Sequence, residues 1–261
     1  MDARITTSKD AKSAFLNGYL EEEVYIEQPD GFQLSDKKEY VCKLKKPLYG
    51  LKQAPRAWYE RLDSYLQSQD FKRGSVDCNL YCKIDGENMI IVEVYVDDII
   101  FGSDDEKTSK DFAKKMQLEF EMSLLGELIF FLGLQIIQSK EGIFIHQTKY
   151  VKDMLKKFQF EDCKPVGTPM MVGCKLNKED DSKYFDQRIY RSMYGSLLYV
   201  TTSRPDVKQA VGMVARFQSA PKETHVLAVK RMFVYLKGTM NLRLWYPSKK
   251  SFSLRAYSDA D

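Results

Sequence analysis

The sequence predicts an α+β fold, with strands and helices mixed in its first half and a mainly helical second half. Before about residue 147, short apolar runs lie between turn signals, as is typical of strands. The 261 residues suffice for two modest domains, and a hydrophobic content of 44% suffices for a core. After residue 147, apolar residues recur at helical spacing, first at Tyr150, Val151, Met154, Leu155 and Phe158.

Charge and cysteine content narrow the class of protein only slightly. The formal charge of +3 arises from 40 basic and 37 acidic residues, and so neither requires nor excludes nucleic acid. Five cysteines without framework spacing fit a reducing compartment, and Cys78 and Cys82 lack the further ligands of a zinc site. There is no apolar stretch of membrane-spanning length and no secretory pattern, so we expect an intracellular protein without a membrane partner.

Short strands and one helix are expected before the hairpin described next. Residues 1–10 are polar and show no pattern, whereas 24–28 and 40–44 are short apolar runs bounded by turn residues. The loop 47–55 is rich in residues that break helices and strands. From about Arg56, apolar side chains follow one face of a helix, at Trp58, Leu62, Tyr65 and Leu66.

An acidic hairpin is predicted at the centre of the first half. The apolar run 89–96 reads as one strand and 99–101 as its returning partner, with Asp97 and Asp98 between them. Residues 103–106 (SDDE) then supply an N-cap and an acidic first turn for a helix. Two more strands are expected, at 128–138 and 143–146.

The second half contains an irregular polar segment, 167–185, followed by three more helices. Each helix is marked by apolar residues on one face, and the last is closed by Gly238. The marking residues are Tyr190, Met193, Leu197 and Leu198; then Val207, Val211, Val214 and Ala215; then Val226, Val229, Met232, Phe233 and Leu236.

Asp97 and Asp98 are the strongest candidates for a metal site. Adjacent carboxylates beside an apolar strand are costly unless a cation balances them, and their oxygens suit magnesium or manganese. Many Asp-Asp pairs are only turn or N-cap residues, but phosphoryl transfer by two metal ions needs two or three converging carboxylates. Asp10 is the candidate third, although its spacing fits a solvated residue of a frayed terminus equally well.

Several strings resemble copia-class LTR retrotransposon reverse transcriptases, and the resemblance covers nearly the whole chain beyond Asp10. Residues 10–18 (DAKSAFLNG) resemble the first catalytic motif of that family, and 95–98 (YVDD) are similar to its second. Residues 131–133 (FLG) resemble its primer-grip turn. Further matching strings are 27–32 (EQPDGF), 48–59 (LYGLKQAPRAWY), 190–205 and 235–239 (YLKGT).

The resemblance implies a right-hand polymerase palm with an antiparallel sheet and packing helices, followed by a mainly helical thumb and connection. The expected segments are 1–146 for partial fingers and palm, 147–220 for the thumb, 221–250 for the connection, and 251–261 for the start of a ribonuclease H domain.

The implied activity is RNA-directed DNA polymerisation by two-metal nucleotidyl transfer. Asp10, Asp97 and Asp98 would hold two Mg²⁺ or Mn²⁺ ions. The partners would be an RNA or DNA template with its primer and deoxynucleoside triphosphates, in a cytoplasmic particle or the nucleus. The alternative is a truncated, inactive remnant that only binds primer-template or does nothing.

The resemblance also assigns residues around the substrate. Phe15 matches the aromatic position that excludes a ribose 2′-hydroxyl, although it also fits an ordinary core aromatic. Lys52 and Arg56 would contact phosphates, unless they belong to a merely solvated basic loop. The residues expected to line the nucleotide and template side are Tyr49, Gly50, Lys52, Gln53 and Arg56.

Three further residues are expected to contact nucleic acid. Leu132 and Gly133 would form the primer-grip turn, where glycine lets the backbone approach the primer end. Gly195 lies in the helix that resembles the thumb helix along the duplex minor groove, although helix packing explains this glycine nearly as well.

The sequence departs from the family at both ends. Residues 1–9 do not resemble the fingers segment that precedes the first catalytic aspartate, so we expect the fingers to be largely missing and the sheet to be short of an edge strand. Residues 256–261 resemble the opening strand of a ribonuclease H domain, with Asp259 at its first acid, and we expect no ribonuclease H activity.

Overall fold

The computed structural model describes residues 4–11, 13–33 and 39–248. The chain forms two compact units, Met1–Leu128 and Ile129–Asp261. Both combine antiparallel sheets with helices, so the predicted mixture of strands and helices is confirmed at this level.

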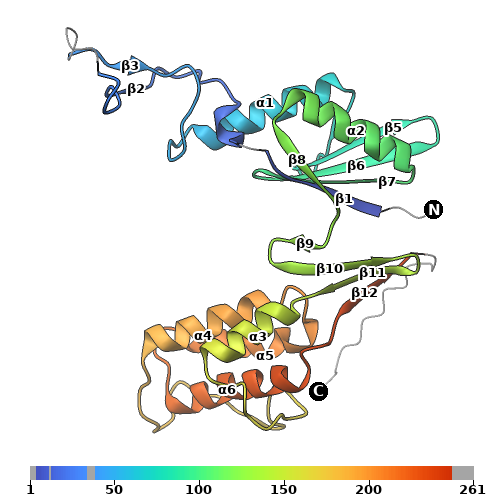
Figure 1. The fold of residues 1–261 in the computed structure, drawn as a ribbon. Helices are drawn as coiled ribbons and strands as arrows, with labels where there is room; N and C mark the ends of the chain where they lie inside the picture. Colours follow the sequence, from blue (N-terminus) through green and yellow to red (C-terminus); the bar gives the residue numbers. More distant parts are fainter. Residues whose placement is uncertain (1–3, 12, 34–38, 249–261) are drawn as a thin grey trace. The chain divides into compact units, whose positions relative to one another are not determined.

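A six-stranded antiparallel sheet forms the base of the first unit, in the order β4-β5-β6-β7-β1-β8. Helices α1 (Ala54–Ser68) and α2 (Glu106–Glu119) cover one of its faces (Figure 1). The strands are β1 (Arg4–Ala11), β4 (Lys72–Arg73), β5 (Leu80–Asp85), β6 (Asn88–Tyr95), β7 (Asp98–Ser103) and β8 (Met122–Glu127).

The core of the first unit follows from two periodicities. Alternate residues of β6 and β7 point toward the helices and are buried, because successive side chains of a strand face opposite sides. The apolar face of α1 meets them. The buried residues include Ile90, Val92 and Val94 on β6, Ile99 and Phe101 on β7, and Trp58, Leu62 and Leu66 on α1.

Strand β1 lies in the N-terminal segment, whose sequence is polar and shows no pattern. Its backbone pairs with β7 on one side and β8 on the other, with Thr6 opposite Phe101 and Ser8 opposite Ile99. The sequence shows no apolar alternation here, but paired neighbours satisfy the backbone on both edges, and Ile5, Thr6 and Thr7 are β-branched. Strand β8, which was not predicted either, forms the sheet edge beyond it.

A small two-stranded sheet lies in the segment before α1. Strand β2 (Tyr25–Ile26) pairs with β3 (Cys42–Lys43), so the strands predicted at 24–28 and 40–44 are present but shorter. A 3-10 helix, η1 (Ala14–Leu16), follows β1 and contacts α1.

In its described residues, the second unit contains a four-stranded antiparallel sheet and four α-helices. The helices share one core, which includes Leu197, Val211 and Phe233. The sheet order is β12-β11-β10-β9, and Figure 1 shows β10, β11 and β12 side by side. The strands are β9 (Phe130–Phe131), β10 (Leu134–Ser139), β11 (Gly142–His146) and β12 (Leu244–Pro247). The helices are α3 (Thr148–Lys157), α4 (Gln187–Val200), α5 (Pro205–Val214) and α6 (Glu223–Gly238), with a short 3-10 helix, η2 (Ala215–Phe217), after α5.

The first unit ends at Leu128 and the second begins at Ile129. Within the second unit, β11 pairs with the distant β12, with Ile143 opposite Tyr246. Helix α6 also shares its core with α3, α4 and α5. Residues 251–261, including Asp259, lie outside the described residues.

Candidate functional site

The Asp97–Asp98 pair lies at the end of a tight hairpin, as the sequence predicts, but only Asp97 is in the turn and Asp98 is the first residue of β7. Tyr95 pairs with Asp98, which leaves Val96 and Asp97 as the two central residues. The positive φ of 59° belongs to Val96 and not to Asp97, which is the pattern of a type II′ turn. Both aspartates are half-buried, and the hairpin places one in the turn and the other at the start of β7.

Val96 is strained in this turn. The first central position of a type II′ turn normally holds glycine, whereas valine has a β-branched side chain that disfavours positive φ. A sparsely populated backbone conformation of this kind costs a residue with a Cβ on the order of 1–3 kcal/mol. Strained residues persist where the surrounding structure holds them, and they cluster at functional sites.

Helix α1 holds the strained residue through two hydrogen bonds. The indole Nε1 of Trp58 donates to the Val96 carbonyl oxygen at 2.6 Å. The Val96 amide donates to the Tyr59 hydroxyl at 3.0 Å. These two side chains were not predicted to contact the turn, because the spacing of Trp58 signals only a core position.

The backbone of β1 brings Asp10 to the same end of the sheet. Ser8 is opposite Ile99, and Asp10 follows two residues later, where β7 begins at Asp98. The pairing with β8 is irregular between Lys9 and Ala11, at the position of Asp10. Three acidic residues from two neighbouring strands therefore share one end of the sheet. Among the described side chains, a set that excludes that of Asp10, no three metal-ligating residues form a cluster.

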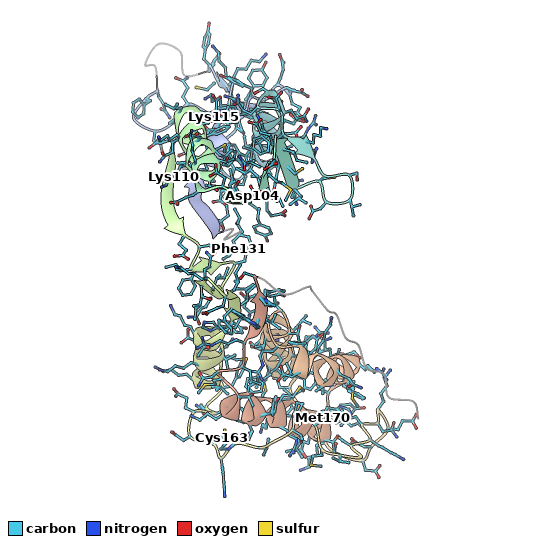
Figure 2. All side chains as sticks on the ribbon, turned by 90° about the vertical axis from the view of Figure 1, so that its right-hand side faces the viewer. Asp104, Lys110, Lys115, Phe131, Cys163 and Met170 are labelled. Carbon is cyan, nitrogen blue, oxygen red and sulfur yellow. The ribbon has the colours of Figure 1, made fainter. Side chains whose placement is uncertain are left out.

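A second acidic pair, Asp104 and Asp105, has a structural role instead. Asp104, labelled in Figure 2, accepts a hydrogen bond from the Met89 amide at 3.0 Å. Asp105 caps α2 by accepting from the Thr108 amide and hydroxyl, both at 2.8 Å. These hydrogen bonds from Thr108 lower the pKa of the Asp105 carboxyl. The N-cap alternative left open for Asp-Asp pairs therefore describes this pair, whereas Asp97 lies in a hairpin turn.

Phe15 and Tyr49 form an aromatic pair beside the core of the first unit. Their ring centroids are 5.4 Å apart in an edge-on arrangement. Phe15 is half-buried against the core, whereas Tyr49 is 62% exposed. Tyr49 lies in a turn closed by the Leu51 amide and the Leu48 carbonyl, with Gly50 at a φ of 90°. Both predicted roles of Phe15 are compatible with this position, at the rim of the core.

The basic residues of the predicted substrate loop differ in their surroundings. Lys52 is exposed, and Gln53 is half-buried at the N-cap of α1. The Arg56 guanidinium is surrounded by carboxylates, which raise its pKa, first through the hydrogen bond to Glu60. A phosphate would have to compete with these acids for Arg56. The distances from guanidinium nitrogens of Arg56 to the carboxylate oxygens are 2.8 Å for Glu60, 3.3 Å for Glu21 and 3.6 Å for Glu22.

The predicted primer-grip turn is held by a tyrosine of α4. Leu132 and Gly133 connect β9 and β10 with φ values of 46° and 79°, directly after Phe131, which is labelled in Figure 2. The Tyr199 hydroxyl donates a hydrogen bond to the Leu132 carbonyl. A Cβ at Gly133 would lie 2.2 Å from that hydroxyl oxygen, so a larger residue would have to displace Tyr199 and adopt a φ of 79°, which favours glycine.

Gly195 lies on the exposed face of α4. A Cβ at this position would have no neighbour within 4 Å, so packing inside the chain does not explain the glycine. The exposed residues around it are Arg188, Ile189, Arg191, Ser192 and Leu198.

Comparison with known protein families shows which class of protein this chain belongs to. A profile of the family described as reverse transcriptase (RNA-dependent DNA polymerase) matches residues 1–172. The match begins at residue 1, so it includes the segment before Asp10 that, from the sequence alone, does not resemble the family.

Individual relatives are Pol polyproteins of transposons. The chain is 38% identical over 97% of its length to the retrovirus-related Pol polyprotein from transposon RE1 of Arabidopsis thaliana and to that from transposon TNT 1-94 of Nicotiana tabacum. It is 31% identical over 96% of its length to the putative transposon Ty5-1 protein YCL074W of Saccharomyces cerevisiae. The chain belongs to the reverse transcriptase family of these Pol polyproteins, which confirms the copia-class resemblance, and by family it is a nucleotidyltransferase.

The chain spans 17% of the RE1 polyprotein, 20% of the TNT 1-94 polyprotein and 82% of the Ty5-1 protein. Among the described residues, no helix has the length and apolar content needed to cross a bilayer.

Proposed function

We propose that this chain carries out RNA-directed DNA polymerisation, with Asp10, Asp97 and Asp98 as the ligands of two Mg²⁺ or Mn²⁺ ions. The observation that supports this most is the strained hairpin turn that presents Asp97 and Asp98 beside the end of β1. Carboxylate oxygens are the ligands that these hard cations prefer, and the half-buried position limits competition from water.

In the proposed reaction, the primer 3′-oxygen attacks the α-phosphate of a deoxynucleoside triphosphate in line. The new bond joins the 3′-oxygen to phosphorus, and the bond to pyrophosphate breaks. Bound divalent ions supply activation of the attacking oxygen and charge stabilisation of the leaving group. Asp10, near the end of β1, and Asp97, in the turn before β7, would orient the reacting groups. Asp98 would assist from the start of β7.

The two units would then have different tasks. The first unit would act as the palm, with the loop before α1 facing the nucleotide. The second would act as thumb and connection, with the Leu132–Gly133 turn and the exposed face of α4 along the primer-template duplex. We propose that this activity takes place inside the cell, because the similar proteins are named as transposon Pol polyproteins.

Primer extension tests the proposed activity. With poly(rA)/oligo(dT), dTTP and Mg²⁺ or Mn²⁺, we expect template-dependent extension of the primer. Salt-dependent retention of the duplex without extension would support a binding protein instead, because phosphate contacts weaken as salt rises. Neither extension nor retention would indicate an inert remnant.

Replacing Phe15 with valine should relax selection against ribonucleotides. A smaller side chain would leave room for the 2′-hydroxyl, and we expect incorporation of ribonucleotides relative to deoxynucleotides to rise by about 10-fold. Single-nucleotide extension with rUTP and dTTP measures the ratio. Phe32→Val is the matched control, because Phe32 is 82% exposed and lies outside the proposed site. An unchanged ratio in Phe15→Val would leave Phe15 as a core aromatic only.

Replacing Gly195 with alanine should make the protein more stable but weaken its hold on the duplex. Alanine favours an exposed helix position by roughly 1 kcal/mol. If the face around Gly195 packs on the duplex, the added methyl group should weaken retention by about fivefold or more.

Gly212→Ala is the matched control for this variant. Gly212 is also helical and exposed, with no neighbour within 4 Å of a Cβ, but it lies on α5. We expect the same gain in thermal stability and no change in duplex affinity. Unchanged duplex binding by Gly195→Ala would contradict the assignment of this face.

A further inference from the structure

Both peptide groups that flank Val96 are bound by adjacent residues of α1. The amide on one side donates to the Tyr59 hydroxyl at 3.0 Å, and the carbonyl on the other accepts from Trp58 Nε1 at 2.6 Å. Each peptide group is planar, so the only soft torsions between the two groups are the φ and ψ of Val96. Fixing both groups therefore fixes these two torsions, and with them the direction in which the chain enters Asp97.

The hydrogen bonds offset a conformation that Val96 would not adopt on its own. The φ of 59° suits glycine, and the β-branched side chain makes it unfavourable. A pair of hydrogen bonds is comparable in strength with the strain of one residue in an unfavourable backbone conformation. The turn is thus maintained by contacts from outside the hairpin and not by its own sequence.

The donor of one of these contacts is itself held rigidly. Trp58 is fully buried, and its ring lies edge-on to Phe120 with centroids 5.2 Å apart. Phe120 also packs edge-on against Tyr65 of the same helix, at 5.3 Å. A side chain with its rotamer fixed by the core can hold a neighbouring group in a defined position.

We propose that Trp58 and Tyr59 are positioning residues that hold the Val96 turn in the geometry in which Asp97 and Asp98 bind metal. The inference rests on the proposed polymerase function and goes beyond it, since neither side chain is expected to touch the ions, the nucleotide or the primer. It also gives a physical role to the end of the string at 48–59, where Trp58 and Tyr59 follow the predicted substrate loop.

Tyr59→Phe tests the proposal with the smallest change, since the ring remains and only the hydroxyl acceptor is lost. We expect exchange of the Val96 amide hydrogen, followed by NMR, to accelerate by about two- to tenfold. We expect kcat for nucleotide incorporation to fall by about the same factor, with KM for dTTP nearly unchanged and a higher Mg²⁺ requirement.

Tyr65→Phe is the matched control on the same helix. It removes a tyrosine hydroxyl that donates to the Lys115 carbonyl at 3.1 Å, away from the turn. Its kinetic constants and Val96 exchange should equal those of the wild type. A second check is Val96→Gly, because glycine adopts the turn without strain. In that background, Tyr59→Phe should change kcat by less than about twofold.

The outcomes separate the positioning role from the polymerase function. Unchanged Val96 exchange in Tyr59→Phe, or an equal loss of kcat in Tyr65→Phe, would overturn the positioning role. A wild-type protein without polymerase activity would count against the proposed function, while the exchange measurement would still decide whether Tyr59 holds the turn.

Discussion

Asp97→Asn is expected to lower the rate of primer extension by at least about 10³-fold, the largest effect of any substitution considered for activity. The amide keeps the size of the side chain but removes the negative charge that would hold a divalent ion. A ligand to both ions contributes several kcal/mol of transition-state stabilisation, which corresponds to this factor. The rate is measured with poly(rA)/oligo(dT) and dTTP in excess.

Asp104→Asn is the matched control for that result. It makes the same acid-to-amide change in the neighbouring acidic pair, where the retained carbonyl oxygen can still accept from the Met89 amide. Activity of this variant should stay near that of the wild type. Equal activity of Asp97→Asn and the wild type would remove Asp97 from the proposed site.

Arg204→Met is expected to destabilise the second unit by about 3 kcal/mol. The Arg204 guanidinium is 3% exposed and binds both carboxylate oxygens of Asp206, at 2.8 and 2.6 Å. It also donates to the carbonyl and hydroxyl of Thr239 at 2.9 and 2.7 Å, which links the start of α5 to the end of α6. Methionine keeps the apolar stem but leaves the Asp206 charge without its cation. Urea unfolding followed by far-UV circular dichroism measures the loss.

The loss of stability in Arg204→Met should depend on pH in a defined direction. Burial raises the pKa of Asp206, but hydrogen bonds from Arg204 and Tyr235 outweigh burial and lower it below its ordinary value of 3.8. The lowered pKa contributes stability above about pH 3.8, and this contribution is lost as the pH falls through the folded-state pKa. The difference in free energy of unfolding between the wild type and Arg204→Met should therefore become smaller as the pH falls below about 3.8.

Arg56→Met is the comparison for Arg204→Met. Arg56 also has carboxylate partners, but its side chain is 60% exposed, so water and salt screen these pairs and the loss should be much smaller. Equal losses for the two variants would show that the buried cluster around Arg204 does not stabilise the second unit.

The hairpin at Asp97 could be predicted because it follows local rules. The apolar run of β6, the turn and the returning β7 lie next to one another in the sequence, and each has a recognisable pattern. The helices of the second unit were predictable for the same reason, since one face of each is apolar.

Strand β1 could not be predicted, because its sequence shows no apolar alternation. Its residues are mostly polar, and its position depends on partners in β7 and β8 that lie far along the sequence. The carboxylates around Arg56 illustrate the same limit, because Glu21 and Glu22 reach it only through the folding of the segment before α1.

The contacts that hold the candidate site left no signal in the sequence. Trp58 has the spacing of a core residue, and the structure adds a hydrogen bond to Val96 that no periodicity reveals. Tyr199 likewise contacts the Leu132 carbonyl from another element of the second unit. A side-chain hydrogen bond to a distant backbone group depends on the tertiary fold, so it becomes visible only in the structure.

Binding of Mn²⁺, followed by electron paramagnetic resonance, tests most directly whether Asp10, Asp97 and Asp98 form a two-metal site. The titration uses the chain with a primer-template ended by a dideoxynucleotide and the next matching deoxynucleoside triphosphate, so that no turnover occurs. We expect two tightly bound Mn²⁺ ions per wild-type complex, with loss of tight binding in Asp97→Asn and in Asp10→Asn but not in Asp104→Asn. Equal Mn²⁺ binding by the wild type and Asp97→Asn would contradict the two-metal site.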